Sequence, residues 1–168
     1  MSDPTSLPNF MPATPAGPNG SGQSENPVRD RILSVLTSPP IGLEAQVDGD
    51  GDIEFKIIDE QGQATTLFAR VLEGDLPLVR FFGQWQLQEP VSPDRNERIA
   101  RCNDLTLQLN IVKLTLVQES LVVSAEHVVT PNADLDTLVP LSVNLILQAV
   151  GFFYQSWQPA EGAPADGQ

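Results

Sequence analysis

Three aspartates at alternate positions form the chain's clearest pattern for chemistry. Asp48, Asp50 and Asp52 resemble the start of an EF-hand loop, in which alternate carboxylates coordinate Ca²⁺. The sixth position of that loop requires Gly and is Ile53 here, and the twelfth is Asp59 where the loop has Glu. Because the residues from Ile53 onward alternate as in a strand, we interpret the aspartates as an acidic hairpin turn and expect no metal site.

Two other groups of reactive side chains have simple structural interpretations. Cys102 and His127 are the only residues of their types, and they fall in a predicted helix and a predicted strand, so a Cys–His nucleophile pair would require a chance meeting. On the apolar side of its helix, Cys102 should remain a protonated thiol. Asp134 and Asp136 lie in the first turn of a predicted helix, where the helix dipole favours negative charge. We therefore expect no catalytic residue and no cofactor.

Length and charge narrow the remaining classes of function. The 168 residues, 40% of them hydrophobic, are enough for one domain with a real core. The net charge of -13 would repel nucleic acid and anionic membrane surfaces. We therefore expect protein partners and no nucleic acid.

The location is predicted from the cysteine count and from the N-terminal sequence. A single Cys suits a reducing compartment, and the first 28 residues contain no Lys or Arg and no continuous apolar run typical of a signal peptide. The longest apolar stretch, Leu135–Trp157, is interrupted by Pro140 and several polar residues. We therefore expect a cytoplasmic protein in which this stretch is a buried helix, without membrane insertion.

Composition divides the chain into three parts. Residues 1–25 contain five prolines and many Gly, Ser and Asn residues, with too few apolar groups to offset the entropy of ordering. We predict a disordered arm there, in which Phe10 and Met11 are candidates for a short docking element. A folded domain over residues 26–158 and a second disordered tail over 159–168 should follow.

Within the domain, apolar spacing predicts an α+β fold with an antiparallel sheet, in the order α-β-β-β(-β)-α-β-β-α. Asn26 with Pro27, Ser92 with Pro93 and Thr130 with Pro131 should each cap and open a helix. Pro140 should kink the last helix or delay its start. Between the helices, alternating runs predict the strands 43–47, 53–58, 65–72, 78–87, 112–116 and 121–125.

Two of these strands, 65–72 and 78–87, carry apolar residues on both alternating faces. A sheet with one face in water would normally be polar on that side, so something should cover the second face. One alternating set mixes aromatic and aliphatic residues with two arginines, a composition enriched in protein interfaces. We predict that this set forms a partner-binding surface: Phe68, Arg70, Leu72, Leu78, Arg80 and Phe82. The alternatives are that one of the helices covers these side chains, or that they form a homodimer face.

Over residues 28–157 the chain resembles the YbjN family of bacterial proteins, whose fold is grouped with type III secretion chaperones. The resemblance is carried by the Asp-Gly hairpin 48–55, the segment 98–105 before a two-strand hairpin, and the helix 138–153. It implies a chaperone-like fold and binding of peptides or client proteins, commonly by a dimer, and it implies no catalytic residues. The Pro-rich arm and Pro140 depart from the expected pattern.

We therefore predict a non-enzymatic, chaperone-like adapter or regulator that binds a protein or peptide client, by strand addition at a sheet edge or in an apolar groove. A small enzyme with acid–base carboxylates in the β-rich half is the first alternative. A structural subunit with a large permanent interface is the second.

Overall fold

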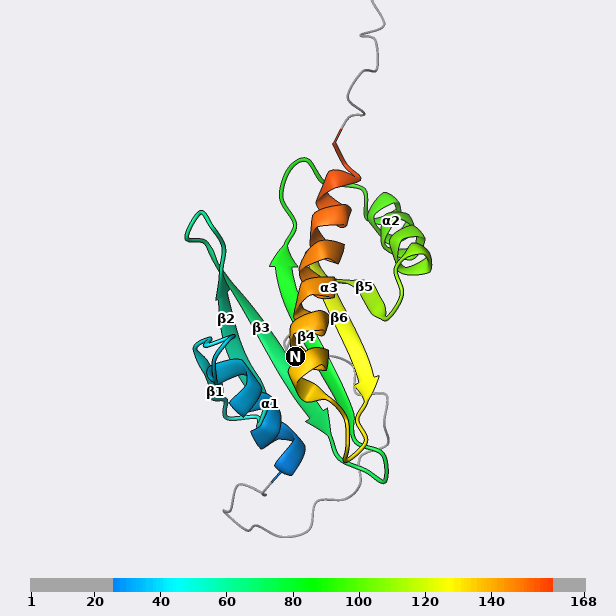
Figure 1. The fold of residues 1–168 in the computed structure, drawn as a ribbon. Coiled ribbons are helices and arrows are strands. Elements are labelled where there is room, and N and C mark those ends of the chain that lie inside the picture. The colour runs from blue at the N-terminus through cyan, green and yellow to red at the C-terminus, as the bar shows by residue number, and fades with distance from the viewer. Residues whose placement is uncertain (1–25, 159–168) are drawn as a thin grey trace, which may run out of the picture.

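A computed structural model of the chain describes residues 26–158 and gives them an α+β fold (Figure 1). The predicted fold class and order of elements are confirmed, with four strands between the first two helices. The predicted arm 1–25, with Phe10 and Met11, and the predicted tail 159–168 lie outside the described residues. The elements are α1 (Pro27–Thr37), β1 (Ala45–Val47), β2 (Ile53–Ile58), β3 (Ala64–Leu72), β4 (Leu78–Gln86), α2 (Arg95–Gln108), β5 (Val112–Val117), β6 (Ser120–Val128) and α3 (Leu135–Gln155).

All strand pairs in the six-stranded sheet are antiparallel, and the strand order is β1-β2-β3-β4-β6-β5. The first four strands form a meander, and the β5–β6 hairpin then returns with β6 against β4. Four consecutive residues at the start of β6, Ser120–Val123, are buried, whereas Lys113 and Thr115 on β5 are exposed. This difference in burial agrees with the strand order, in which β6 is an interior strand and β5 lies at the edge.

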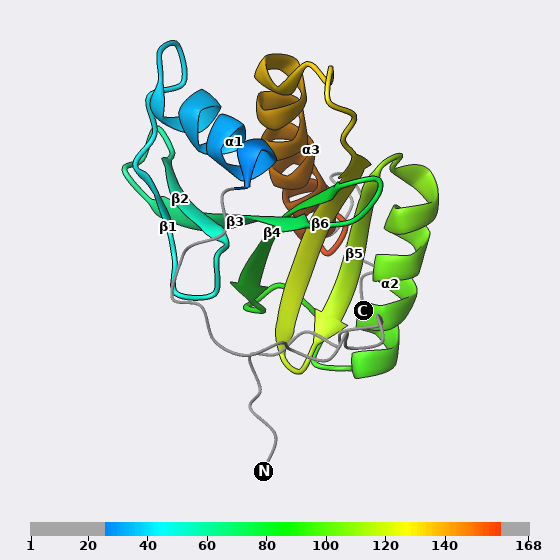
Figure 2. The same cartoon turned by 90° about the horizontal axis from the view of Figure 1, so that it is seen from below.

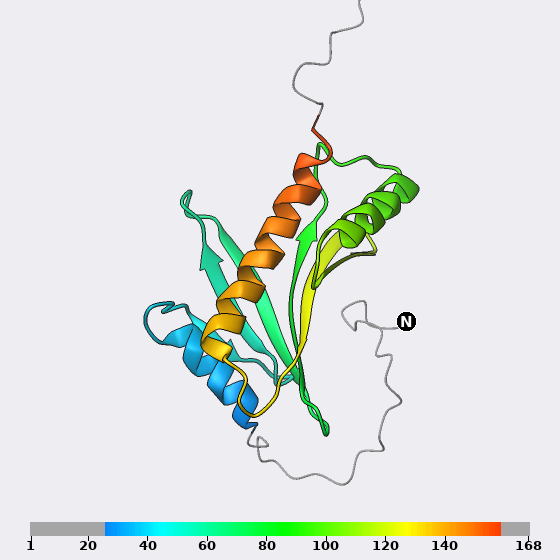
Figure 3. The ribbon, with the colours of Figure 1, turned by 45° about the vertical axis from the view of Figure 1, so that its right-hand side comes forward.

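The described helices pack on one face of the sheet. Figure 2 shows α1 and α3 on the same side of the strands with α2 beside β5, and Figure 3 shows α3 lying between α1 and α2. Contacts agree with this view, because α1 meets β1 to β3, α3 meets β4 to β6, and α2 meets β5. The core fills the space between, and its largest fully buried side chains include Phe55, Phe81 and Phe153.

Only one of the three predicted helix caps is confirmed. Asn26 caps α1 as expected, its side chain accepting the Arg29 N–H at 2.9 Å. The predicted starts of the other two helices are wrong by a few residues. Asp94 caps α2 and Asp134 caps α3. In both cases an Asp just downstream of the Pro accepts the free N–H groups of the first turn and displaces the Ser or Thr cap.

α3 runs as one helix through Pro140, which lies in its second turn. Its side toward the sheet is buried, as predicted for this stretch, whereas Leu141 and Phe152 on its other side are exposed. Among the described residues, α3 is the one helix long and apolar enough to cross a bilayer by length and composition. Core helices also meet that criterion, and six residues of α3 are buried against the rest of the domain.

Candidate functional site

The six residues predicted as a partner surface lie together on one face of β3 and β4. The register places Phe68 opposite Phe82, Arg70 opposite Arg80, and Leu72 opposite Leu78. Directly paired residues share a face, so the surface consists of an aromatic, a cationic and an aliphatic band. We call the face of the sheet that carries these side chains the open face.

The open face is opposite the helices. The alternate residues of the same strands, among them Leu67, Ala69, Val79 and Phe81, are fully buried beneath α1 and α3. All six residues of the predicted surface are half-buried, and no described helix lies on their side of the sheet (Figure 2). Within the described residues, the alternative that a helix covers this surface is therefore wrong.

The aromatic band is a stacked pair. The Phe68 and Phe82 ring centroids are 5.3 Å apart with an interplanar angle of 22°. The guanidinium carbon of Arg70 lies 5.7 Å from the Phe82 ring centroid, within range of a cation–π contact. Both rings are half-buried, so part of the stacked pair remains exposed on the open face.

Arg70 is held by Asp52, which lies just before β2. Its Nε and Nη2 donate to the two carboxylate oxygens at 2.6 to 3.0 Å, and only 8% of the Asp52 side chain is exposed. The hydrogen bond to Asp52 raises the pKa of Arg70, against the opposing effect of burial. The pair fixes one edge of the cationic band.

Arg80 is held in the same way on the opposite side. Its Nε and Nη2 each lie 2.6 Å from Oε1 of Glu126 on β6, and Lys113 on β5 donates to Oε2 of the same carboxylate. Burial alone would raise the pKa of Glu126, but Lys113 and Arg80 together hold it below its usual range. The Nη1 groups of Arg70 and Arg80 have no partner within residues 26–158, so each can donate to a bound acceptor.

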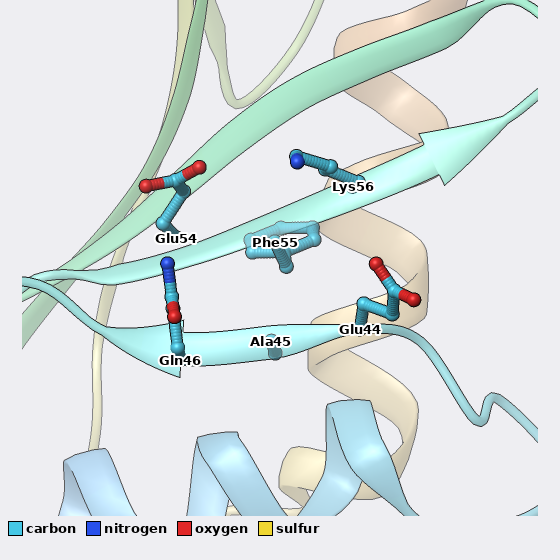
Figure 4. Close-up of a pocket in the computed structure, with 6 residues that line it drawn as sticks. All are labelled: Glu44, Ala45, Gln46, Glu54, Phe55 and Lys56. Atoms are coloured by element: carbon cyan, nitrogen blue, oxygen red, sulfur yellow. The ribbon is translucent and has the colours of Figure 1, made fainter.

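Toward β1 the open face becomes a shallow charged depression of about 380 Å³. Figure 4 shows Glu44, Gln46, Glu54 and Lys56 standing on one side of the β1–β2 hairpin. Their side chains make no hydrogen bond or ion pair with one another in the part of the chain that the structure describes. Glu44 and Glu54 thus lie near each other in the β-rich half, where the enzymatic alternative expects acid–base carboxylates.

In the acidic turn Asp48–Asp52, the carboxylates of Asp48 and Asp52 have hydrogen-bond partners within the domain. Asp48 Oδ1 accepts the backbone N–H groups of Asp50 and Asp52 at 2.9 and 3.0 Å, and the Asp52 carboxylate binds Arg70. No group of three metal-ligating residues occurs among residues 26–158. The turn closes the β1–β2 hairpin, as the interpretation of the three aspartates predicts.

One polar pair between the sheet and α3 was missed by sequence reasoning. His127 Nε2 lies 2.8 Å from Ser142 Oγ, and that hydroxyl donates to the carbonyl of Leu138 at 2.7 Å. Burial lowers the pKa of His127, and Ser142 is fully buried, so a substrate has no access to its hydroxyl. The interruption of an apolar helix face by Ser142 was the available signal, and the pair links β6 to α3.

The thiol that sequence analysis considered as a nucleophile is also in the core. Cys102 is buried on α2, and burial raises its pKa to about 11. At neutral pH the side chain is therefore a thiol, and thiols are poor nucleophiles.

No family model and no curated protein matches the chain.

Proposed function

We propose that the chain is a non-enzymatic, chaperone-like adapter that holds an extended segment of a client protein on the open face. The observation that carries this proposal is the stacked Phe68–Phe82 pair on the side of the sheet opposite the helices. An uncovered apolar surface on a folded domain typically marks an interaction site. The resemblance to the YbjN family supports the same kind of function.

The surface has the composition that suits peptide binding. Apolar bands provide area that loses contact with water, and the arginines between them offer directional donors to backbone or side-chain acceptors. Each arginine already has a carboxylate partner, so the surface presents little net charge. This favours a mixed polar and apolar client segment over a strongly anionic ligand.

Binding is tested with a permanently unfolded probe, reduced and carboxamidomethylated α-lactalbumin carrying a fluorescent label. We expect the full chain to raise the anisotropy of the probe. A Phe68→Ser, Phe82→Ser variant should bind at least ten times more weakly while keeping its circular dichroism spectrum. The matched control is Leu107→Ser, because Leu107 is 87% exposed on α2, away from the open face.

Equal losses of probe affinity in both variants, or no binding of the probe by the wild type, would contradict the proposal.

Light scattering on the same samples tests the remaining alternatives. A dimer that the Phe68→Ser, Phe82→Ser variant converts to monomers would make the open face a homodimer interface. Co-purification of the chain with one large permanent complex would favour the structural subunit.

A further inference from the structure

β3 and β4 separate at one end, and this leaves two strand edges facing each other. Their pairing runs from Leu72↔Leu78 to Leu67↔Gly83 and stops there. Beyond that point, residues 64–66 of β3 pair only with β2, and residues 84–86 of β4 pair only with β6. Figure 1 shows the β2–β3 hairpin leaning away from β4 at this end. On the side facing the other strand, three residues of each strand therefore have no strand partner.

Two aromatic side chains pack against β4 where it separates from β3. The Trp85 ring packs over Gly83, where a Cβ atom would lie 2.5 Å from the ring and 2.5 Å from Leu67 Cδ2. At the far end, the Tyr154 hydroxyl on α3 donates to the carbonyl of Gln86 at 3.2 Å. Aromatic side chains thus contact β4 at both ends of the stretch that does not pair with β3.

The space between the strands is a cleft of about 490 Å³, which we call the divergence cleft. Apart from Glu89 its lining is uncharged, and the side chains of its Gln and Thr residues make no hydrogen bonds within residues 26–158. Aromatic rings of Phe68, Trp85 and Tyr154 complete it. Unpaired backbone, free amides and aromatic surfaces together suit an uncharged, extended peptide.

The same chain contains a segment of that chemistry. In a protein with 22 acidic residues, no charged residue occurs between Pro4 and Ser24. Two three-residue stretches in it, 5–7 and 9–11, lie between the prolines at 4, 8 and 12. Because they contain no proline, they keep all their backbone N–H groups for strand pairing. The second stretch contains Phe10, which matches the aromatic lining. Each stretch has the length of one unpaired edge of the cleft.

The connection between this segment and the domain is long enough. Asn26 donates to Glu73, one residue beyond β3 and at the opposite end of that strand from the cleft. The strand itself spans about 30 Å, whereas the 15 residue steps from Met11 to Asn26 can span about 50 Å when extended. The connection is therefore long enough for the segment to reach the cleft of its own molecule.

We propose that residues 5–11 bind in the divergence cleft of the same chain as an extended strand, with Phe10 against its aromatic lining. Phe68 belongs both to this cleft and to the open face. Occupation of the cleft by the segment therefore competes with a client on the open face. This last step rests on the proposed function, whereas the binding of the segment does not.

The binding is tested in the full chain with a spin label at Thr5→Cys in a Cys102→Ser background. We expect strong paramagnetic broadening of the amide signals of residues 64–66 and 84–86. A Phe10→Ser substitution should abolish the broadening. The control is Pro18→Ala, which lies in the same uncharged N-terminal stretch but outside residues 5–11, and it should leave the broadening unchanged. Absence of broadening at these amides overturns the inference, whatever the probe binding shows.

Two further measurements separate the other outcomes. The first uses a mixture of two samples, one isotope-labelled without a spin label and the other spin-labelled without isotope. Broadening of the isotope-labelled chain in this mixture would show that a second copy supplies the segment. That result overturns binding within one chain. If the segment competes, Phe10→Ser should bind the unfolded α-lactalbumin probe at least three times more tightly than wild type. Unchanged probe affinity overturns the competition, and broadening without any probe binding counts against the proposed function instead.

Discussion

Arg70 and Arg80 stand directly opposite each other on neighbouring strands, and each is held by a carboxylate on its outer side. Like charges in a directly paired position destabilise a sheet. Asp52 and Glu126 offset this cost and hold the two guanidinium groups toward opposite edges of the open face. The arrangement keeps two cations on the open face without leaving either of them unpaired.

Arg70→Ala should lower the free energy of unfolding by about 1 to 3 kcal/mol, because it leaves the buried Asp52 carboxylate without its partner. The Arg70 side chain is 36% exposed, so the cost should stay below that of a fully buried pair. Urea unfolding measures the change. The double variant Asp52→Ala, Arg70→Ala should recover part of the loss, and strictly additive losses would contradict the assigned pairing.

Acidification should destabilise the domain through His127. Burial lowers the pKa of His127 below its ordinary value of 6.5, so the unfolded chain takes up this proton first. Stability from this group is therefore complete above about pH 6.5 and is lost as the pH falls through the lower pKa of the folded state. Unfolding midpoints measured between pH 7.5 and 5 should decline in wild type and decline less in His127→Gln. Parallel profiles would show that His127 is not the titrating group.

Gly83→Ala should destabilise the fold and disturb the divergence cleft. The added Cβ would meet Leu67 and Trp85 at 2.5 Å, and overpacking of this kind costs about 1 to 3 kcal/mol. We expect the fluorescence emission of Trp85 to shift as its ring moves. Gly74→Ala is the matched control, because a Cβ there meets nothing within 4 Å. Similar effects of the two substitutions would contradict the close packing of Trp85 over Gly83.

Cys102 should react slowly in the native state. With a pKa of about 11 and a buried position, it should alkylate with iodoacetamide at least about 100 times more slowly at pH 7.5 than an exposed thiol. Leu107→Cys in a Cys102→Ser background supplies an exposed thiol on the same helix. Denaturant should abolish the difference, and equal rates in native protein would show that Cys102 is accessible.

Local patterns in the sequence were sufficient to predict which segments form helices and strands. Alternating apolar residues define β2, β3 and β4, and helical spacing defines α1, α2 and α3, because both periods depend only on neighbours along the chain. Exact helix starts were less predictable. Ser92 and Asp94 are both good capping residues, and the choice between them depends on where the following helix packs.

For the candidate site too, some features could be predicted from the sequence and others could not. The sequence by itself identified Phe68, Phe82 and the two arginines as residues of one alternating set, because strand periodicity is a local property. Only the tertiary structure decided that the helices leave this set uncovered, that His127 meets Ser142, and that β3 and β4 separate beyond Gly83. These features depend on hairpin register, strand order and the packing of side chains distant in sequence, on which a local pattern carries no information.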